Sequence, residues 1–173
     1  MLPVHPTLHQ TPVLISGPEI ARIEELMGRL DMRLETISDN VGDASTIKMV
    51  RSVMVKGIKS LVSESIIAAV SEGIDERVLD SLEATYPGMN WKNRTGVMLE
   101  RMVRHGKRRA EEMREVAITM DDLGIGGAMS TATAARQQQV ADLNLLDAFN
   151  DDPPQDYRIL ARAILKARKA LEP

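Results

Sequence analysis

Apolar residues recur at every third or fourth position from Ile47 to Val70, which is the periodicity of one helical face. Gly42 allows the chain to turn into this helix, Asp43 is expected to cap it, and Gly73 ends it. The pattern predicts a single helix of about 30 residues, roughly 45 Å long. Further apolar residues widen the face until it nearly encircles the helix, so we expect burial against several neighbours. They are Met49, Val53, Val55 and Ile67.

The residues before this helix predict a strand, a helix and a second strand. Residues 12–17 form a short apolar run between a proline and a glycine, typical of a buried strand. Pro18 is favoured at a helix start, and residues 32–37 alternate as a second strand does. Such a crossover unit normally has parallel strands. Two strands are not stable alone, so another chain, the helices or residues outside this sequence must complete the sheet.

The residues after Gly73 predict only helices. Asp75 is expected to cap a short helix, and a long helix is expected from Asn90 to Leu123. Within it, Gly96 and Gly106 are possible points of close approach or bending. The glycine cluster at residues 124–127 predicts a turn, and two further helices follow. We therefore expect a mainly α fold, with an all-helical domain at residues 42–173 preceded by a smaller unit at residues 1–41.

Composition excludes several classes of function. The formal net charge of −3 offers no electrostatic attraction to nucleic acid or to a membrane surface. No apolar run is long enough to cross a bilayer. The chain has no cysteine, which removes disulfides, thiolate metal sites and cysteine nucleophiles and is compatible with the cytoplasm, where we expect the protein. Its three histidines lack the spacing of metal ligands, so no metal is expected.

Two groups of residues could carry chemistry. Lys48 and Ser52 lie one turn apart near the start of the long helix, where the helix dipole and partial burial would lower the pKa of an amine until it could exchange a proton. The alternative is a lysine whose stem packs on the helix and whose ammonium reaches water. His105, Arg108 and Arg109 share one side of a later helix with Glu112, so a guanidinium could face a carboxylate or phosphate. The alternative is a solvated face balanced by glutamates.

The segment from Gly42 to Ser52 resembles the link between the two domains of β-hydroxyacid dehydrogenases, the superfamily of hydroxyisobutyrate and phosphogluconate dehydrogenases. In that link a glycine precedes a long interdomain helix, and a lysine six residues later is catalytic; here that residue is Lys48. The closer match, Asp43-Ala44-Ser45 with Lys48-Met49 and Arg51-Ser52, is similar to a phosphogluconate-dehydrogenase-like subgroup with its own C-terminal helical domain. The family usually has an asparagine where this chain has Ser52.

The resemblance extends towards the N-terminus, where residues 3–7 and 11–17 look like the last third of the family's dinucleotide-binding domain. It implies that residues 1–41 are a remnant of that domain and that His5 and Thr7 contact substrate. The first part of the domain, with its Gly-x-Gly-x-x-Gly loop, has no counterpart in this sequence. The complete enzyme would use NAD or NADP, whereas we expect this chain alone to bind neither and to be inactive.

The resemblance also implies roles for individual residues in the oxidation of a small, acidic hydroxy-acid substrate. Lys48 would take the proton of the substrate hydroxyl while hydride leaves the adjacent carbon for the nicotinamide, and Ser52 would orient the substrate. Arg108 or Arg109 would hold its acidic group, and His105 would be a proton donor or an anion ligand. We expect a homodimer because so apolar a helix needs cover. The alternative function is that of a non-catalytic, self-associating helical protein derived from the same family.

Overall fold

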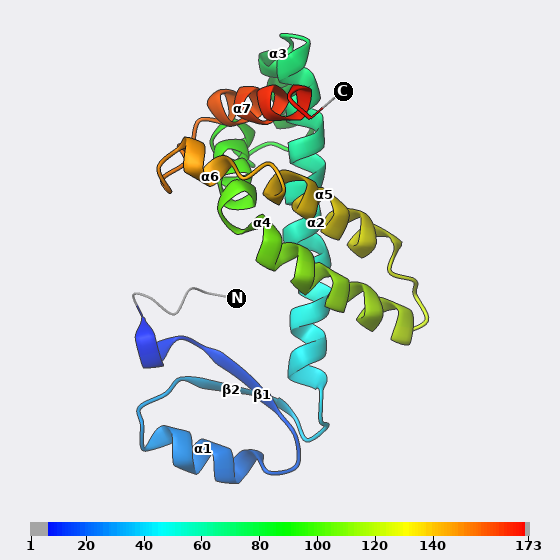
Figure 1. The fold of residues 1–173 in the computed structure, drawn as a ribbon. Helices are drawn as coiled ribbons and strands as arrows, with labels where there is room; N and C mark the ends of the chain where they lie inside the picture. The colour runs from blue at the N-terminus through cyan, green and yellow to red at the C-terminus, as the bar shows by residue number, and fades with distance from the viewer. Residues whose placement is uncertain (1–6, 172–173) are drawn as a thin grey trace. The chain divides into compact units, whose positions relative to one another are not determined.

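The computed structural model describes residues 7–171, and these divide into two compact units between Arg51 and Ser52 (Figure 1). One long helix, α2, contributes its first turns to the first unit and the rest to the second. The first unit, unit 1, also holds a 3-10 turn, two strands and a helix. These are η1 (Leu8–Gln10), β1 (Val13–Ser16), α1 (Ile20–Gly28) and β2 (Leu34–Ser38), followed by the start of α2 (Asp43–Ser71).

Unit 1 has the predicted strand-helix-strand order. β1 and β2 pair in parallel, with Val13 opposite Leu34 and Ile15 opposite Thr36, and no third strand joins them within residues 7–171. The prediction of a buried first strand is wrong, because the residues of β1 are exposed or only half-buried. Burial of such a strand requires cover on both faces, and the described part of unit 1 contains one helix and one neighbouring strand.

The long helix is continuous over 29 residues, as predicted, and enters through Gly42 at a φ of 101°. Asp43 is not its cap, because Asp43 is already the first helical residue and accepts a hydrogen bond from the Ser38 hydroxyl. Instead, Ser16 at the end of β1 accepts a hydrogen bond from the Ala44 N–H at 3.1 Å. The strand therefore supplies the oxygen that satisfies the helix end.

Burial along α2 is uneven, so the prediction of a helix covered all round is wrong. The buried apolar residues lie in its C-terminal half, whereas Met54 and Leu61 are 64% and 60% exposed. The apolar period of the sequence is correct, but the other helices cover only one side of α2 in the described chain. The buried apolar residues are Val62, Ile66, Ile67 and Ala69.

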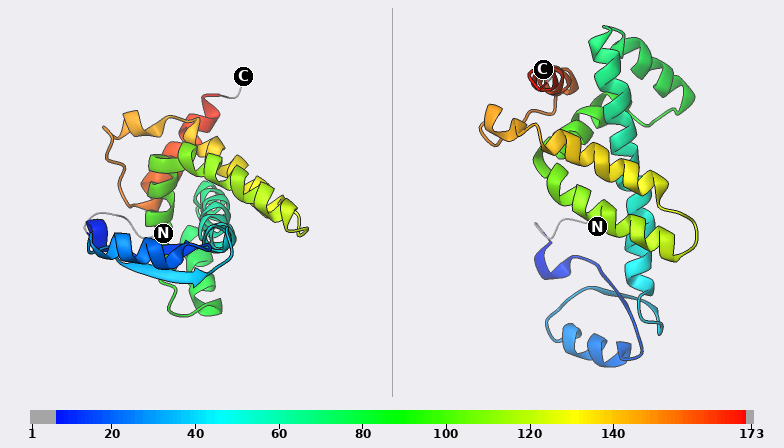
Figure 2. Two further views of the ribbon diagram at one scale, coloured as in Figure 1. Left: turned by 90° about the horizontal axis from the view of Figure 1, so that it is seen from below. Right: turned by 45° about the vertical axis from the view of Figure 1, so that its right-hand side comes forward.

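Unit 2 is all helical and contains the hydrophobic core. α4 packs along α5 and also contacts α7 and α3 (Figures 1 and 2). The elements are α3 (Asp75–Thr85), α4 (Trp91–Asp122), α5 (Ala128–Ala141), α6 (Leu145–Ala148) and α7 (Tyr157–Lys169). The largest side chains that are fully buried are Ile66, Leu99, Met102, Met113, Leu160 and Ile164. The predicted mainly α fold, with a short strand-helix-strand segment, is thus confirmed.

Glycines allow close packing along α4, which changes direction part-way along its length (Figure 2). A Cβ added at Gly96 would lie 1.8 Å from the Gln155 carbonyl oxygen, and one at Gly106 would lie 2.8 Å from the Gln137 carbonyl oxygen. Both predicted points of close approach are therefore real. The predicted turn after α4 also forms, with positive φ angles at Gly124 and Gly126.

Asp75 does not cap α3 as predicted but joins α3 to α7. Its carboxylate accepts hydrogen bonds from the Tyr157 hydroxyl at 2.6 Å and from the Arg158 Nε at 2.7 Å. The cap oxygen of α7 belongs to the side chain of Asp156, which accepts from the Arg158 and Ile159 amides.

Among the helices of residues 7–171, none is both long enough and apolar enough to cross a bilayer.

Candidate functional site

A row of polar residues runs along the part of α2 that belongs to unit 2. Ser52, Lys56 and Ser60 are spaced by four residues, so they lie one above the other on the helix, and all three are buried. Lys56 is only 9% exposed, which is rare for a lysine. Its Nζ donates to the Ser52 Oγ at 3.1 Å and lies 2.9 Å from the Glu112 Oε2. A buried ammonium is thus held between a hydroxyl and a carboxylate.

Glu112 connects this row to α4. Its other carboxylate oxygen pairs with Arg108, which lies one turn earlier on α4 and is largely exposed. Burial raises the pKa of Glu112, but the hydrogen bond and charge of Lys56, together with the charge of Arg108, lower it below its usual value. Glu112 therefore carries a negative charge at neutral pH and fixes the Lys56 ammonium in place.

Arg109, which follows Arg108 on α4, is a buried guanidinium with no ion pair among the described residues. It is 6% exposed, and its Nη1 is buried with no hydrogen-bond partner among the described residues. Burial lowers the pKa of Arg109, and the charges of Arg101 and Arg108 lower it further. Because a buried cation is costly unless it is paired, Arg109 is suited to an anion that enters from outside the chain.

His105 precedes Arg109 by one turn of α4 and is half-buried. Burial lowers the pKa of His105 first, and the charges of Arg109 and Arg108 lower it further. The imidazole is therefore neutral at pH 7 and can donate or accept one hydrogen bond beside the guanidinium. The predicted one-sided group on α4 is present, but Arg108 belongs to its solvated edge and Arg109 to its buried edge.

The other predicted site residues lie in unit 1 or outside the described residues. The side chain of Lys48 is exposed in the described chain, which agrees with the alternative in which its ammonium reaches water and not with partial burial. The neighbours that would bury it are not supplied by residues 7–51. Thr7 is exposed, and its hydroxyl lies 2.7 Å from that of Thr11. His5 lies outside the described residues.

Sequence reasoning missed Lys56, which is the buried lysine of α2. A signal was present, because polar residues recur every fourth position from Lys48 through Ser52 and Lys56 to Ser60 along one side of the helix. The sequence does not show which residue pairs with Lys56. Glu112 lies 56 positions later, on another helix, and only the fold brings it to the Lys56 ammonium.

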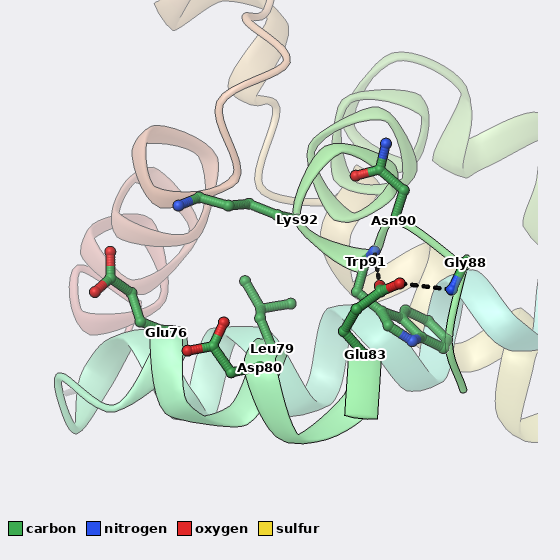
Figure 3. Close-up of a pocket in the computed structure, with 8 residues that line it drawn as sticks. All are labelled: Glu76, Leu79, Asp80, Glu83, Gly88, Asn90, Trp91 and Lys92. Atoms are coloured by element: carbon green, nitrogen blue, oxygen red, sulfur yellow. Dashed lines mark hydrogen bonds between the residues drawn. The ribbon is translucent and has the colours of Figure 1, made fainter. Parts of the chain in front are cut away.

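Pockets formed by the described residues lie elsewhere in the molecule. The first, of about 400 Å³, lies where α3 meets the start of α4 (Figure 3). Glu83 in this pocket accepts hydrogen bonds from the Gly88 amide at 2.7 Å and from the Trp91 amide at 3.1 Å, so it caps α4. The pocket is lined by three carboxylates, those of Glu76, Asp80 and Glu83, and by one lysine, so its lining is acidic on balance and does not favour an acidic ligand.

The second pocket, of about 560 Å³, is a mostly apolar groove between α4 and α5, edged by Arg114 and Asp142. The third, of about 530 Å³, lies within unit 1 beside the end of β1 and the starts of α1 and α2. No group of three or more His, Asp or Glu side chains in residues 7–171 is arranged to hold a metal ion.

The turn from β1 into α1 does not fit a dinucleotide. Such a cofactor needs a glycine-rich turn whose amides face the pyrophosphate at a helix N-terminus. Here Gly17 is followed by Pro18, which has no N–H, and Glu19 occupies the cap position, where its charge would repel phosphate. The described residues of unit 1 therefore do not form the pyrophosphate site of a nicotinamide cofactor.

The architecture is a helical domain organised on one long helix that follows a parallel strand-helix-strand unit. Residues 69–140, all within unit 2, match the family model described as "Domain of unknown function (DUF1932)". No curated protein matches the chain.

Two solved structures are similar to this chain. A conserved hypothetical protein from Sinorhizobium meliloti 1021 is 31% identical, with a TM-score of 0.84, over 96% of this chain and 55% of that one. The conserved protein MTH1747, described as structurally similar to 3-hydroxyacid dehydrogenases, is 29% identical, with a TM-score of 0.70, over 82% of this chain and 54% of that one. The chain thus spans about half the length of the structures it matches, and the predicted resemblance to hydroxyacid dehydrogenases is confirmed.

Proposed function

We propose that this chain is the substrate-side and dimerisation portion of an NAD(P)-dependent dehydrogenase that acts on a small β-hydroxy acid. The observation that carries the proposal is the similarity to MTH1747, itself described as similar to 3-hydroxyacid dehydrogenases, over a chain about half as long. The buried, unpaired guanidinium of Arg109 adds chemical support, because it is suited to the carboxylate of such a substrate. The setting would be the cytoplasm.

The surroundings of Arg109 and His105 support their proposed roles, and the other residues take their roles from the family resemblance. Arg109 holds the acidic group of the substrate, with neutral His105 beside it, whereas Arg108 is already engaged by Glu112. Ser52 orients the substrate, and Lys48 takes the proton of its hydroxyl. His5 and Thr7 would contact the substrate from the N-terminal end.

The nicotinamide cofactor belongs to the complete enzyme and accepts the hydride there. Because the turn after β1 lacks the features of a pyrophosphate site, this chain alone is expected to bind neither NAD nor NADP and to have no activity. Covering residues would also be required to bring Lys48 out of water, which favours its action as a base.

The test is binding of a small hydroxy acid by the full chain. NMR titration with 3-hydroxypropionate should give saturable shifts at α4 residues around Arg109, and Arg109→Met should remove them. Arg101→Met is the matched control, because Arg101 is an exposed arginine on the same helix. A wild-type chain that binds none of a series of short hydroxy acids would contradict the proposal.

The alternative is a non-catalytic helical protein that self-associates. It is favoured by one observation, the exposure of Met54 and Leu61 two turns apart on α2. Both functions lead us to propose a homodimer that covers this face. Analytical ultracentrifugation of the wild type and Leu61→Lys tests the dimer, and the hydroxy-acid titration distinguishes the two functions. A dimer that binds a hydroxy acid supports the dehydrogenase portion, and a dimer that binds none supports the alternative.

A further inference from the structure

The contact between Lys56 and Ser52 determines which of them donates. A lysine ammonium carries three donors and no acceptor, so the Ser52 oxygen must accept in the contact at 3.1 Å. The proton of the Ser52 hydroxyl is then left for a different acceptor. No such acceptor for Ser52 is found among residues 7–171.

Two other serines on α2 behave differently. Ser63 donates to the Ser60 carbonyl oxygen at 2.8 Å, and Ser71 donates to the Ala68 carbonyl oxygen at 2.7 Å. Donation to a carbonyl of the preceding turn is the usual way in which a helical serine satisfies its proton. Ser52 does not donate in this way, because its oxygen accepts from the buried ammonium one turn along α2. The Ser60 oxygen also accepts, from the Gln137 Nε2 at 3.4 Å, but that donor is a neutral amide.

Lys56 itself is held firmly. Its Nζ lies 2.9 Å from Glu112, which also pairs with Arg108, so Arg108, Glu112, Lys56 and Ser52 form one connected chain of contacts. Hydrogen bonds in such a chain polarise one another, which strengthens the last donor. The last donor here is the Ser52 hydroxyl.

We propose that Lys56 is a positioning residue that turns the Ser52 hydroxyl into a hydrogen-bond donor for an acidic oxygen of the substrate. This inference rests on the proposed function, and it assigns the substrate atom at Ser52 to a carboxylate oxygen, which can only accept when ionised. It also accounts for a serine where the resembling family has an asparagine. A serine polarised by Lys56 supplies the donor that an amide N–H would supply.

The first experiment needs no ligand. The side-chain rotamer of Ser52 is read from its Hα–Hβ NMR couplings in the full chain. We expect one rotamer in the wild type, averaging in Lys56→Met and a single rotamer again in Lys56→Arg, which keeps a donor. Lys107→Met is the matched control, since Lys107 is an exposed lysine on α4. An ordered Ser52 in Lys56→Met overturns the inference, whatever the chain binds.

The second experiment measures affinity for 3-hydroxypropionate and for propane-1,3-diol, which lacks the carboxylate. Lys56→Met and Ser52→Ala should each weaken binding of the acid by about tenfold, the effect of losing one charge-assisted hydrogen bond. Their double variant should bind no more weakly than Ser52→Ala, and the diol should bind poorly to every variant. Additive losses, or equal affinity of Lys56→Met and the wild type, overturn the inference.

The two experiments separate the inference from the proposed function. A Ser52 that is ordered by Lys56 in a chain that binds no hydroxy acid overturns the proposed function and the substrate role of Ser52 together. Binding that depends on Arg109 but not on Lys56 supports the proposed function and overturns the inference alone.

Discussion

The two units of this chain differ most in how they treat their hydrophobic residues. Unit 2 buries Leu99, Met102 and Leu160 completely. In the described part of unit 1, residues 7–51, no hydrophobic side chain is fully buried, and Leu30 and Val41 are largely exposed. All four aromatic residues of the chain also lie in unit 2. They are Tyr86, Trp91, Phe149 and Tyr157.

The difference means that the two units have unequal sources of stability. Burial of apolar surface is the main stabilising contribution to folding, so unit 2 has its own source of stability and a two-stranded unit 1 has little. Trp91 is the single tryptophan and is buried, so its fluorescence reports the unfolding of unit 2. Variants of unit 2 should therefore change that signal strongly, and variants of unit 1 should not.

The largest effect is expected for Gly96→Ala. The added methyl would lie 1.8 Å from the Gln155 carbonyl oxygen, a backbone atom that cannot move without displacing the segment before α7. We expect a loss of more than about 3 kcal/mol in the free energy of unfolding, measured by urea titration of Trp91 fluorescence.

Gly57→Ala is the matched control for this substitution. Its Cβ would have only an ordinary contact, 3.7 Å from the Thr133 hydroxyl, so it should stabilise α2 by about 0.5–1 kcal/mol. If Gly96→Ala were as stable as the wild type, the close packing attributed to unit 2 would be wrong.

The next effect has the opposite sign. Arg109→Met replaces a buried guanidinium that lacks a partner with an apolar side chain of similar length. Removal of a buried charge that has no hydrogen-bond partner or ion pair among the described residues should raise the free energy of unfolding by about 2 kcal/mol, in the same urea titration. The exposed control, Arg101→Met, should change it little. Destabilisation by Arg109→Met would show that the guanidinium is paired in solution and would remove the reason for assigning an anion to it.

Gly96 and Arg109 are both residues that the sequence alone singles out. The period of the apolar residues is sufficient to predict α2 and the crossover unit, and the isolated glycines of α4 are sufficient to indicate close approach. The group at His105, Arg108 and Arg109 follows from helical spacing alone. Each of these features depends on residues that are near one another in the sequence.

Features that depend on distant residues were not predictable. Asp43 and Asp75 are both of a residue type that commonly caps helices. However, the cap oxygen of α2 comes from Ser16, 27 positions before Asp43 along the chain. Asp75 instead pairs with residues of α7. The sequence also does not reveal which lysine of α2 is buried, because burial depends on the neighbouring helix. Lys56 meets Glu112, whereas Lys48 meets no such residue in the described chain.

A smaller effect, about 1 kcal/mol at pH 7, is expected for Tyr157→Phe, which removes the hydrogen bond to Asp75. The hydrogen bond from Tyr157 lowers the pKa of Asp75, although burial of Asp75 opposes the shift, and Arg158 lowers it further. The stabilisation is therefore fully present above the pKa of an unfolded aspartate, about 3.9, and is lost as the pH falls through the lower pKa of Asp75 in the folded state. Burial and Asp75 raise the pKa of Tyr157 to about 12.

The raised pKa of Tyr157 predicts a second pH dependence. A folded pKa above the unfolded value of about 10 stabilises the fold below pH 10, and the contribution disappears as the pH rises towards 12. Urea midpoints measured from pH 2 to pH 12 should therefore fall at the alkaline end for the wild type and less for Tyr157→Phe. Parallel curves for the two proteins would contradict the assignment.

The smallest effect is expected for Lys48→Met in unit 1. Because the Lys48 side chain is exposed, its replacement should change the free energy of unfolding of unit 2 by less than about 0.5 kcal/mol. Lys56→Met removes a buried ammonium from between Ser52 and Glu112 and should be clearly more destabilising. Both variants lose one positive charge from the same helix, so the difference between their urea midpoints isolates burial. If the two midpoints fell equally, Lys48 would be covered in solution, and the contrast between a covered unit 2 and an uncovered start of α2 would be wrong.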